Sequence, residues 1–135
     1  MSTLSVIPQP EGLALQFHHA AIEHGRLHIQ RCSACGRFRH PPRVQCPECF
    51  SPEWTFEPTN EHGTVYSYVV SHRSFDPFWV EHLPFVTVAV ALDEGPRVIA
   101  AMRGVEGADM SLGMPVRLTV EPQSDDFTML WADPA

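Results

Sequence analysis

The sequence predicts a mainly β protein, in which a short N-terminal helix and a small cysteine-rich ribbon precede a barrel of five strands. Three observations lead to this prediction. The four cysteines lie in two C-x-x-C pairs, 13 prolines and 8 glycines divide the 135 residues into short segments, and the region after Gly63 is rich in alternating apolar residues. Short segments bounded by turn residues favour strands over long helices.

The N-terminal part contains one segment with helical periodicity. Residues 1–10 hold two prolines and little to bury, so we expect a loose tail there. Apolar residues recur at helical intervals over 11–23, and Gly25 supplies the stop. Residues 27–31 alternate as a short strand that leads into the first cysteine pair.

The spacing of Cys32, Cys35, Cys46 and Cys49 indicates a closed structural zinc site of the rubredoxin type. Two disulfides or a redox pair are the alternatives. Disulfides would suit a secreted chain, but residues 1–12 hold neither the basic nor the apolar region of an export signal. We therefore expect a cytoplasmic protein with one structural Zn²⁺ held by these four thiolates. A site filled by protein sulfur leaves no ligand position for a substrate, so function must lie elsewhere.

The residues that follow the two cysteine pairs differ. Gly36 follows Cys35 and suits the sharp turn that aims backbone N–H groups at sulfur. Phe50 follows Cys49, and we expect this bulky residue either to accept backbone strain or to alter the second turn.

Five strands are predicted after the ribbon, at residues 63–72, 85–92, 97–103, 115–121 and 127–131. A loop and not a crossover helix joins each strand to the next, which favours the five-stranded OB-fold barrel. The expected organisation is therefore a flexible tail at 1–10, the helix and zinc ribbon at 11–58 and the barrel at 59–135.

Composition excludes several function classes. The net charge of −7 argues against a nucleic-acid partner, because such a partner favours a basic surface. All nine basic residues are arginine, so a lysine Schiff base is excluded. No apolar run approaches the length of a membrane span, and we expect no membrane partner.

The arginines concentrate in the ribbon, where Arg37, Arg39 and Arg43 belong to a stretch without acidic residues. One interpretation is a solvated ribbon whose arginines brace the sulfur site. The other is a local anion-binding face, which would contact the phosphates of a ligand or an acidic partner surface.

The connection at 73–84 carries three aromatic residues, Phe75, Phe78 and Trp79. Exposed aromatic residues in a loop mark a docking patch or a ligand wall, and we expect them to contact a partner or an apolar acyl group. The alternative is that they fold back and close the end of the barrel. His82 with Asp76 or Glu81 could be offered as an acid–base set, but such residues are common in loops, and we predict no catalytic residue. For the same kind of reason, His18, His19 and His24 are not expected to form a second metal site.

Taken together, these segments resemble a known family, the zinc-ribbon plus OB-fold proteins of acyl-CoA metabolism (domain of unknown function thirty-five). The resemblance covers residues 13–131 and rests on an ordered set of segments, at 27–36, 41–43, 46–49, 63–67 and 112–116. Phe50 departs from the glycine that the family usually has after its fourth cysteine.

The resemblance implies a helper and not a catalyst. Similar proteins accompany thiolases and lipid-transfer-protein-like thiolase homologues, help to hold the acyl-CoA, and in some cases are partnered with hot-dog-fold enoyl-CoA hydratases. Related domains support a thiolase-like retro-aldolase that cleaves a steroid side-chain CoA thioester. We therefore expect a non-catalytic accessory subunit in a hetero-oligomer with such an enzyme, with an acyl-CoA ligand. A nucleic-acid-binding module and a stand-alone acyl-CoA enzyme remain the alternatives.

Overall fold

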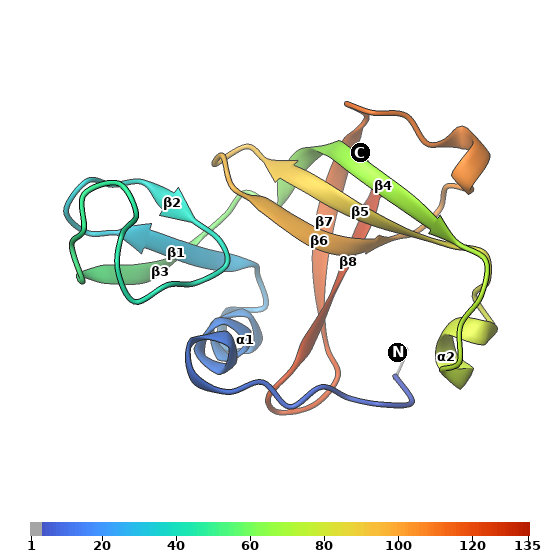
Figure 1. Ribbon diagram of the computed structural model, residues 1–135, viewed down its shortest axis with the longest axis horizontal. Helices are drawn as coiled ribbons and strands as arrows, with labels where there is room; N and C mark the ends of the chain where they lie inside the picture. The colour runs from blue at the N-terminus through green and yellow to red at the C-terminus, as the bar shows by residue number, and fades with distance from the viewer. Residues whose placement is uncertain (1–3) are drawn as a thin grey trace.

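The computed structural model describes residues 4–135 and contains two β units with a helix at their junction. Figure 1 shows a three-stranded ribbon on one side and a barrel on the other, with helix α1 (Gly12–His24) beneath the point where they meet. The fold class predicted from the sequence is confirmed. Residues 1–3 of the predicted tail lie outside the described residues.

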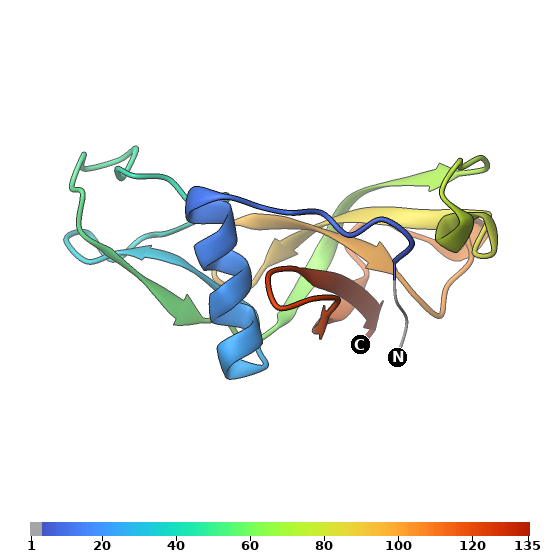
Figure 2. The same ribbon diagram turned by 90° about the horizontal axis from the view of Figure 1, so that it is seen from below.

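Helix α1 ends where the sequence predicts. Gly25 takes the left-handed conformation (φ 62°), which a residue without Cβ adopts at little cost. Figure 2 shows α1 lying beside the C-terminal hairpin of the barrel, and His19 and Asp126 join the two at 2.8 Å. The segment before α1 runs along the barrel, where the backbone N–H of Leu4 donates to Gln123.

The ribbon is a sheet of three antiparallel strands in the order β2-β1-β3. Its strands are β1 (His28–Cys32), β2 (Phe38–Arg39) and β3 (Trp54–Pro58). The predicted strand at 27–31 corresponds to β1, whereas β2 is too short to show a pattern in the sequence. Ile29 of β1 is fully buried and belongs to the same hydrophobic cluster as the barrel interior, so the two units share one core.

The barrel is closed in the order β4-β5-β6-β8-β7, and all its pairs are antiparallel except β6–β8. Its strands are β4 (His62–Ser71), β5 (Phe85–Leu92), β6 (Arg97–Met102), β7 (Pro115–Pro122) and β8 (Thr128–Pro134). All five predicted strands are present, and β8 extends three residues beyond its predicted end. The closure between β6 and β8 is short, since only Ala101 with Trp131 and Met102 with Ala132 are paired there.

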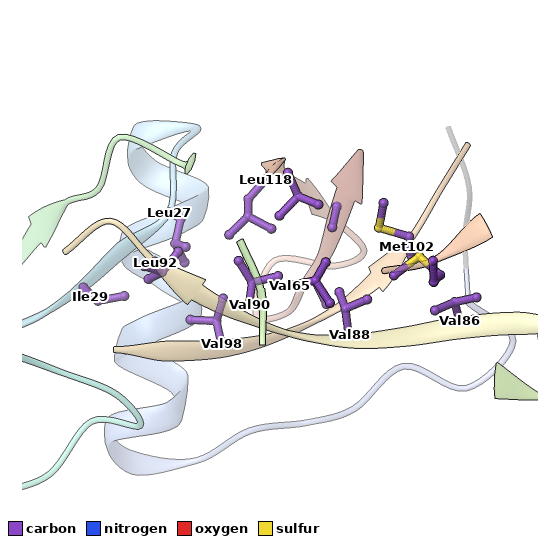
Figure 3. Packing of buried hydrophobic residues seen from close by; sticks show 14 residues of the cluster. Leu27, Ile29, Val65, Val86, Val88, Val90, Leu92, Val98, Met102 and Leu118 are labelled. Carbon is purple, nitrogen blue, oxygen red and sulfur yellow. The ribbon is translucent and has the colours of Figure 1, made fainter. Parts of the chain in front are cut away.

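The barrel interior is filled mainly by valines. On β5, Val86, Val88, Val90 and Leu92 are buried in strict alternation (Figure 3). The alternate residues of β5 are also apolar or small, namely Phe85, Thr87, Ala89 and Ala91. The outward face of β5 therefore lacks the charged residues that a solvated strand usually carries.

Two short helices were missed in the sequence. Helix α2 (Pro77–Val80) begins where the Asp76 carboxylate accepts the backbone N–H of Phe78 at 2.8 Å, with proline at its first position. The second is the 3₁₀ turn η1 (Gly107–Asp109). Both are too short for helical periodicity to appear. Within residues 4–135, no helix has the length and apolar character that crossing a membrane requires.

Candidate functional site

The four cysteines come together at the tip of the ribbon. Their sulfur atoms all lie within 4.8 Å of one another, with Cys32 and Cys49 3.6 Å apart and Cys35 and Cys46 3.7 Å apart. These separations are far longer than the S–S bond of about 2.05 Å in a disulfide. They agree with the edge of about 3.8 Å that a tetrahedron with metal–sulfur bonds of about 2.3 Å would have. The donor set therefore fits a four-thiolate zinc-ribbon site.

The two turns that carry the cysteines have the same backbone geometry. The N–H of Gly36 donates to the carbonyl of Cys32 at 3.0 Å, and the N–H of Phe50 donates to that of Cys46 at 2.9 Å. Both residues are left-handed, with φ of 79° for Gly36 and 65° for Phe50. Phe50 thus accepts strain and keeps the turn, which was one of the two predicted outcomes. Its ring is 68% exposed.

Backbone N–H groups favour the thiolate at the two buried cysteines. The pKa of Cys32 is lowered to about 6, chiefly by the backbone N–H of Cys35, and that of Cys46 is lowered, chiefly by the backbone N–H of Cys49. At Cys49 the backbone N–H of Ser51 favours the thiolate, yet the neighbouring sulfurs and burial raise its pKa to about 11. The neighbouring sulfurs thus disfavour a further thiolate at Cys49, and a bound cation would offset this repulsion.

The predicted arginines line one hollow between the ribbon and the β5–β6 turn. Arg37, Arg39 and Arg43 share this hollow of about 710 Å³ with Arg31, and Glu94 lies at its rim. Arg37 is exposed and lies 3.7 Å from Glu48. The structure brings the three predicted residues together, while their contacts with a ligand or partner remain a prediction.

Arg39 also has a structural role. It is only 7% exposed, and its Nε donates to Gln30 at 2.6 Å while Nη2 donates to the carbonyl of Arg43 at 3.0 Å. The same Gln30 carbonyl oxygen accepts the backbone N–H of Arg43 at 2.7 Å. Nη1 of Arg39 is buried and has no hydrogen-bond partner among the described residues. A buried, incompletely paired guanidinium beside a hollow makes the site electropositive.

The three predicted aromatic residues do not form one patch. Phe75 is 89% exposed, with the Arg73 guanidinium 5.2 Å from its ring centre. Phe78 stacks on His82 at 4.5 Å, and Trp79 packs on Phe85 at 4.6 Å. Phe75 therefore faces solvent and Trp79 folds back on the barrel, while contact of these residues with a partner or an acyl group remains a prediction.

Several of the histidines have a local partner. Nδ1 of His82 lies 2.7 Å from the carbonyl of Phe78, and the Asp76 carboxylate caps α2. Each of these two side chains of the suggested acid–base set therefore has its own structural contact. His18 contacts Thr128 at 3.0 Å, and His24 stacks on His28 with ring centres 4.3 Å apart.

An apolar groove beside α1 was not predicted. It has a volume of about 540 Å³ and is lined by residues from α1, the ribbon, α2, β5, β6 and β8. His18 and His40 are the histidines in its wall. Burial is the main cause that lowers the pKa of each histidine. The nearby His19 lowers the pKa of His18 further. The nearby His18 does the same at His40, where the pKa falls to about 4. The apolar outward face of β5 was the only signal in the sequence that could have indicated this groove.

The fold and the cysteine cluster define a class, a zinc ribbon followed by an OB-fold barrel. Comparison with protein families finds the ChsH2 rubredoxin-like zinc ribbon domain at residues 19–55 and the ChsH2 C-terminal OB-fold domain at residues 57–121. A chain of the solved Ltp2-ChsH2(DUF35) aldolase superposes with a TM-score of 0.83 at 34% identity, covering 95% of this chain and 98% of that one. The chain therefore belongs to the DUF35 family, with domains of the ChsH2 type.

Two curated relatives match part of their own length. The probable enoyl-CoA hydratase alpha subunit of Thermomonospora curvata is 39% identical over 102 residues, which are 76% of this chain and 31% of the relative. The 3-oxo-4,17-pregnadiene-20-carboxyl-CoA hydratase alpha subunit of Mycobacterium tuberculosis is 39% identical over 93 residues, 69% of this chain and 29% of the relative. The chain thus spans less than a third of the length of these relatives.

Proposed function

We propose that this chain is a non-catalytic accessory subunit, which docks on a thiolase-superfamily enzyme of the lipid-transfer-protein type and helps it to bind an acyl-CoA. The observation that carries the proposal is the similarity over nearly the whole of a chain in the Ltp2-ChsH2(DUF35) aldolase. A steroid side-chain CoA thioester is the proposed substrate of the complex, because one relative is named for a pregnadiene carboxyl-CoA.

The proposed reaction is a retro-aldol cleavage performed by the partner. The bond between the hydroxyl-bearing carbon and the α-carbon of the thioester breaks. The hydroxyl loses its proton and becomes a ketone, while the α-carbon leaves with the bonding electrons and takes up a proton. Such a step needs a base and an acid at the scissile bond. In the chain from Leu4 onward, His82 and Asp76 are engaged in capping contacts instead, which supports catalysis by the partner.

The proposed roles of the surfaces follow from their chemistry. One Zn²⁺ bound to Cys32, Cys35, Cys46 and Cys49 would supply only structural cross-linking, since all four donors are protein sulfur. Such thiolates persist in a reducing compartment, which we propose is the cytoplasm. The arginine hollow would face CoA phosphates or an acidic partner surface. Phe75 would contact the partner, because its ring is almost fully exposed.

Reconstitution tests this proposal. The chain and a purified thiolase-superfamily enzyme from the same cells are assayed separately and together on a β-hydroxyacyl-CoA steroid, and the ketone and the shortened acyl-CoA are followed by chromatography. Turnover should require both proteins. Phe75→Ser should weaken complex formation, and the exposed Leu112→Ser serves as the matched control. Turnover by the chain alone would contradict the accessory role.

The same assay distinguishes the proposed aldolase partner from a second candidate, a hydratase. The two curated relatives are hydratase alpha subunits, so a hot-dog-fold hydratase is the alternative occupant of the docking surface. Co-elution with a hydratase, and stimulation of water addition and not of cleavage, would replace the aldolase by a hydratase as the proposed partner.

A further inference from the structure

The apolar groove exists because two neighbouring strands of the barrel separate. Strands β6 and β8 pair only through Ala101 with Trp131 and Met102 with Ala132, near one end of the barrel. Toward the ribbon the strands are no longer paired, and α1 does not fill the space between them. Instead, Phe17 and His18 of α1 form one wall of a groove of about 540 Å³. This volume falls within the range of about 300–1,000 Å³ that small-molecule sites occupy.

The walls of the groove are largely hydrocarbon. They come from separate parts of the chain, with Phe17 on α1, Trp79 on α2, Ile99 on β6 and Leu130 on β8. Ile99 is 66% exposed, so much of its branched apolar side chain is in contact with water. An apolar ligand would therefore bury surface that this chain by itself leaves in water.

At one end the groove offers neutral polar groups. The backbone N–H of Thr128 donates to Nδ1 of His18 at 3.1 Å, so this nitrogen carries no proton. The single proton of the neutral ring is then on Nε2. Nδ1 of His40, in the same wall, is buried without a hydrogen-bond partner. A neutral donor and a neutral imidazole suit a ligand with a carbonyl or hydroxyl group and not a cation.

Among residues 4–135, Arg97 is the only charged residue that lines the groove. Its guanidinium lies 3.6 Å from the centre of the Tyr66 ring, and no carboxylate of residues 4–135 lies within 4 Å of it. An unpaired cation at an apolar groove favours a ligand that is hydrocarbon at one end and anionic at the other. Gly95 and Pro96, directly before Arg97, line the arginine hollow, so the groove leads toward that electropositive surface.

We propose that this groove binds an apolar acyl group, with the hydrocarbon along Trp79 and Ile99 and the carboxyl end toward Arg97. For an acyl-CoA, the phosphates would then continue toward the arginine hollow. The inference deepens the proposed function, on which the choice of an acyl ligand rests, by assigning part of the acyl-binding surface to this chain and not to its partner.

The test uses the full chain, loaded with zinc and without a partner, in ¹H–¹⁵N correlation spectra. The probes are decanoate and a steroid C-20 carboxylate, which share an apolar body and a carboxylate but differ in shape. Binding should shift the indole N–H of Trp79 and the amides of Ile99 and Leu130. Shifts with decanoate alone indicate a chain-shaped group, and shifts with the steroid acid indicate a fused-ring group; either result supports the site.

Variants locate the binding. Thr87→Phe places a ring into the groove from β5 and should abolish the shifts, whereas Ser67→Phe, on the same sheet face but outside the groove, should leave them unchanged. Arg97→Gln should weaken decanoate binding roughly two- to five-fold, as expected for one exposed charge contact, without changing the binding of decanol. Arg117→Gln on β7 is the matched charge control.

Two results would overturn the inference: no shift with either acid, or shifts that persist in Thr87→Phe while its spectrum elsewhere remains that of a folded protein. Because the partner is absent, a failure to bind leaves the docking proposal intact. Conversely, a chain that binds decanoate but never assembles with a thiolase-type enzyme would remove the proposed function and keep the groove.

Discussion

The carboxylate of Glu61 joins the two units of the molecule by accepting the backbone N–H of Leu27 at 3.2 Å. Leu27 leads into the ribbon, and Glu61 lies directly before the first barrel strand. The carbonyl of Glu61 also accepts the N–H of Leu118 on β7 at 2.7 Å. Glu61 adopts φ of 61°, a left-handed conformation that the surrounding hydrogen bonds must maintain.

Removing this carboxylate should loosen the junction. Glu61→Ala leaves the N–H of Leu27 without its acceptor and keeps the left-handed backbone, so we expect the free energy of unfolding to fall by about 1–3 kcal/mol. Urea unfolding followed by tryptophan fluorescence in excess zinc measures it. Glu53→Ala, an exposed acidic residue of the ribbon, is the control. Equal effects of the two substitutions would show that the junction contact contributes little.

Phe50 and Gly36 form a matched pair, because they occupy equivalent left-handed positions. Phe50→Gly should relieve strain of about 1 kcal/mol and lose little packing, since the ring is mostly exposed. The added flexibility of the unfolded chain offsets part of this gain. Gly36→Ala should destabilise the ribbon, because it introduces the same strain at φ 79°. Thermal unfolding of the zinc-loaded proteins should give opposite shifts in Tm; shifts of the same sign would contradict the strain argument.

Burial of His40 should make stability fall in mild acid. Its pKa in the folded protein is lowered to about 4 by burial and by the nearby His18, against an ordinary value of 6.5. Between these values the unfolded chain binds more protons than the folded one, so the contribution is complete above pH 6.5 and is lost progressively as the pH falls toward 4. The loss is on the order of 3 kcal/mol.

His40→Phe keeps a ring against Phe17 and removes the titration, so its stability should depend less steeply on pH over this range. Acid also protonates the cysteine thiolates, and for this reason the measured quantity is the difference between wild type and variant at each pH. The exposed His72→Gln should retain the wild-type slope. A variant slope equal to that of the wild type would assign the acid sensitivity to other groups.

Metal removal should unfold the ribbon. We expect one Zn²⁺ per chain by elemental analysis, and its loss on chelation should abolish the near-ultraviolet dichroism of Trp54, because structural zinc sites supply about 10–16 kcal/mol of apparent binding free energy. Cys46→Ser should have the same effect, whereas Ser51→Ala should retain the metal. A metal-free chain with an unchanged spectrum would remove the structural role of the site.

Much of this molecule could be predicted from local patterns. The cysteine spacing, the turn after Cys35 and the alternation of Val116, Leu118 and Val120 each depend on neighbours in the chain, and they predicted the ribbon and barrel strands. At Phe50 the sequence left two outcomes open, a strained turn or an altered one, and the structure has the strained left-handed turn. Helix α2 and the two-residue strand β2 were not, since segments this short carry no periodicity.

The candidate sites also differ in how far local sequence patterns could predict them. The sequence alone determined that four sulfurs could meet, because C-x-x-C turns bring each pair together and a hairpin joins the pairs. Only the tertiary structure decided that Arg39 donates a hydrogen bond to Gln30. It also decided that Trp79 folds onto the barrel while Phe75 faces solvent, and that β6 and β8 separate to leave a groove beside α1. Those features depend on contacts between residues distant in the chain, and their geometry follows from packing of the whole fold and not from any local pattern.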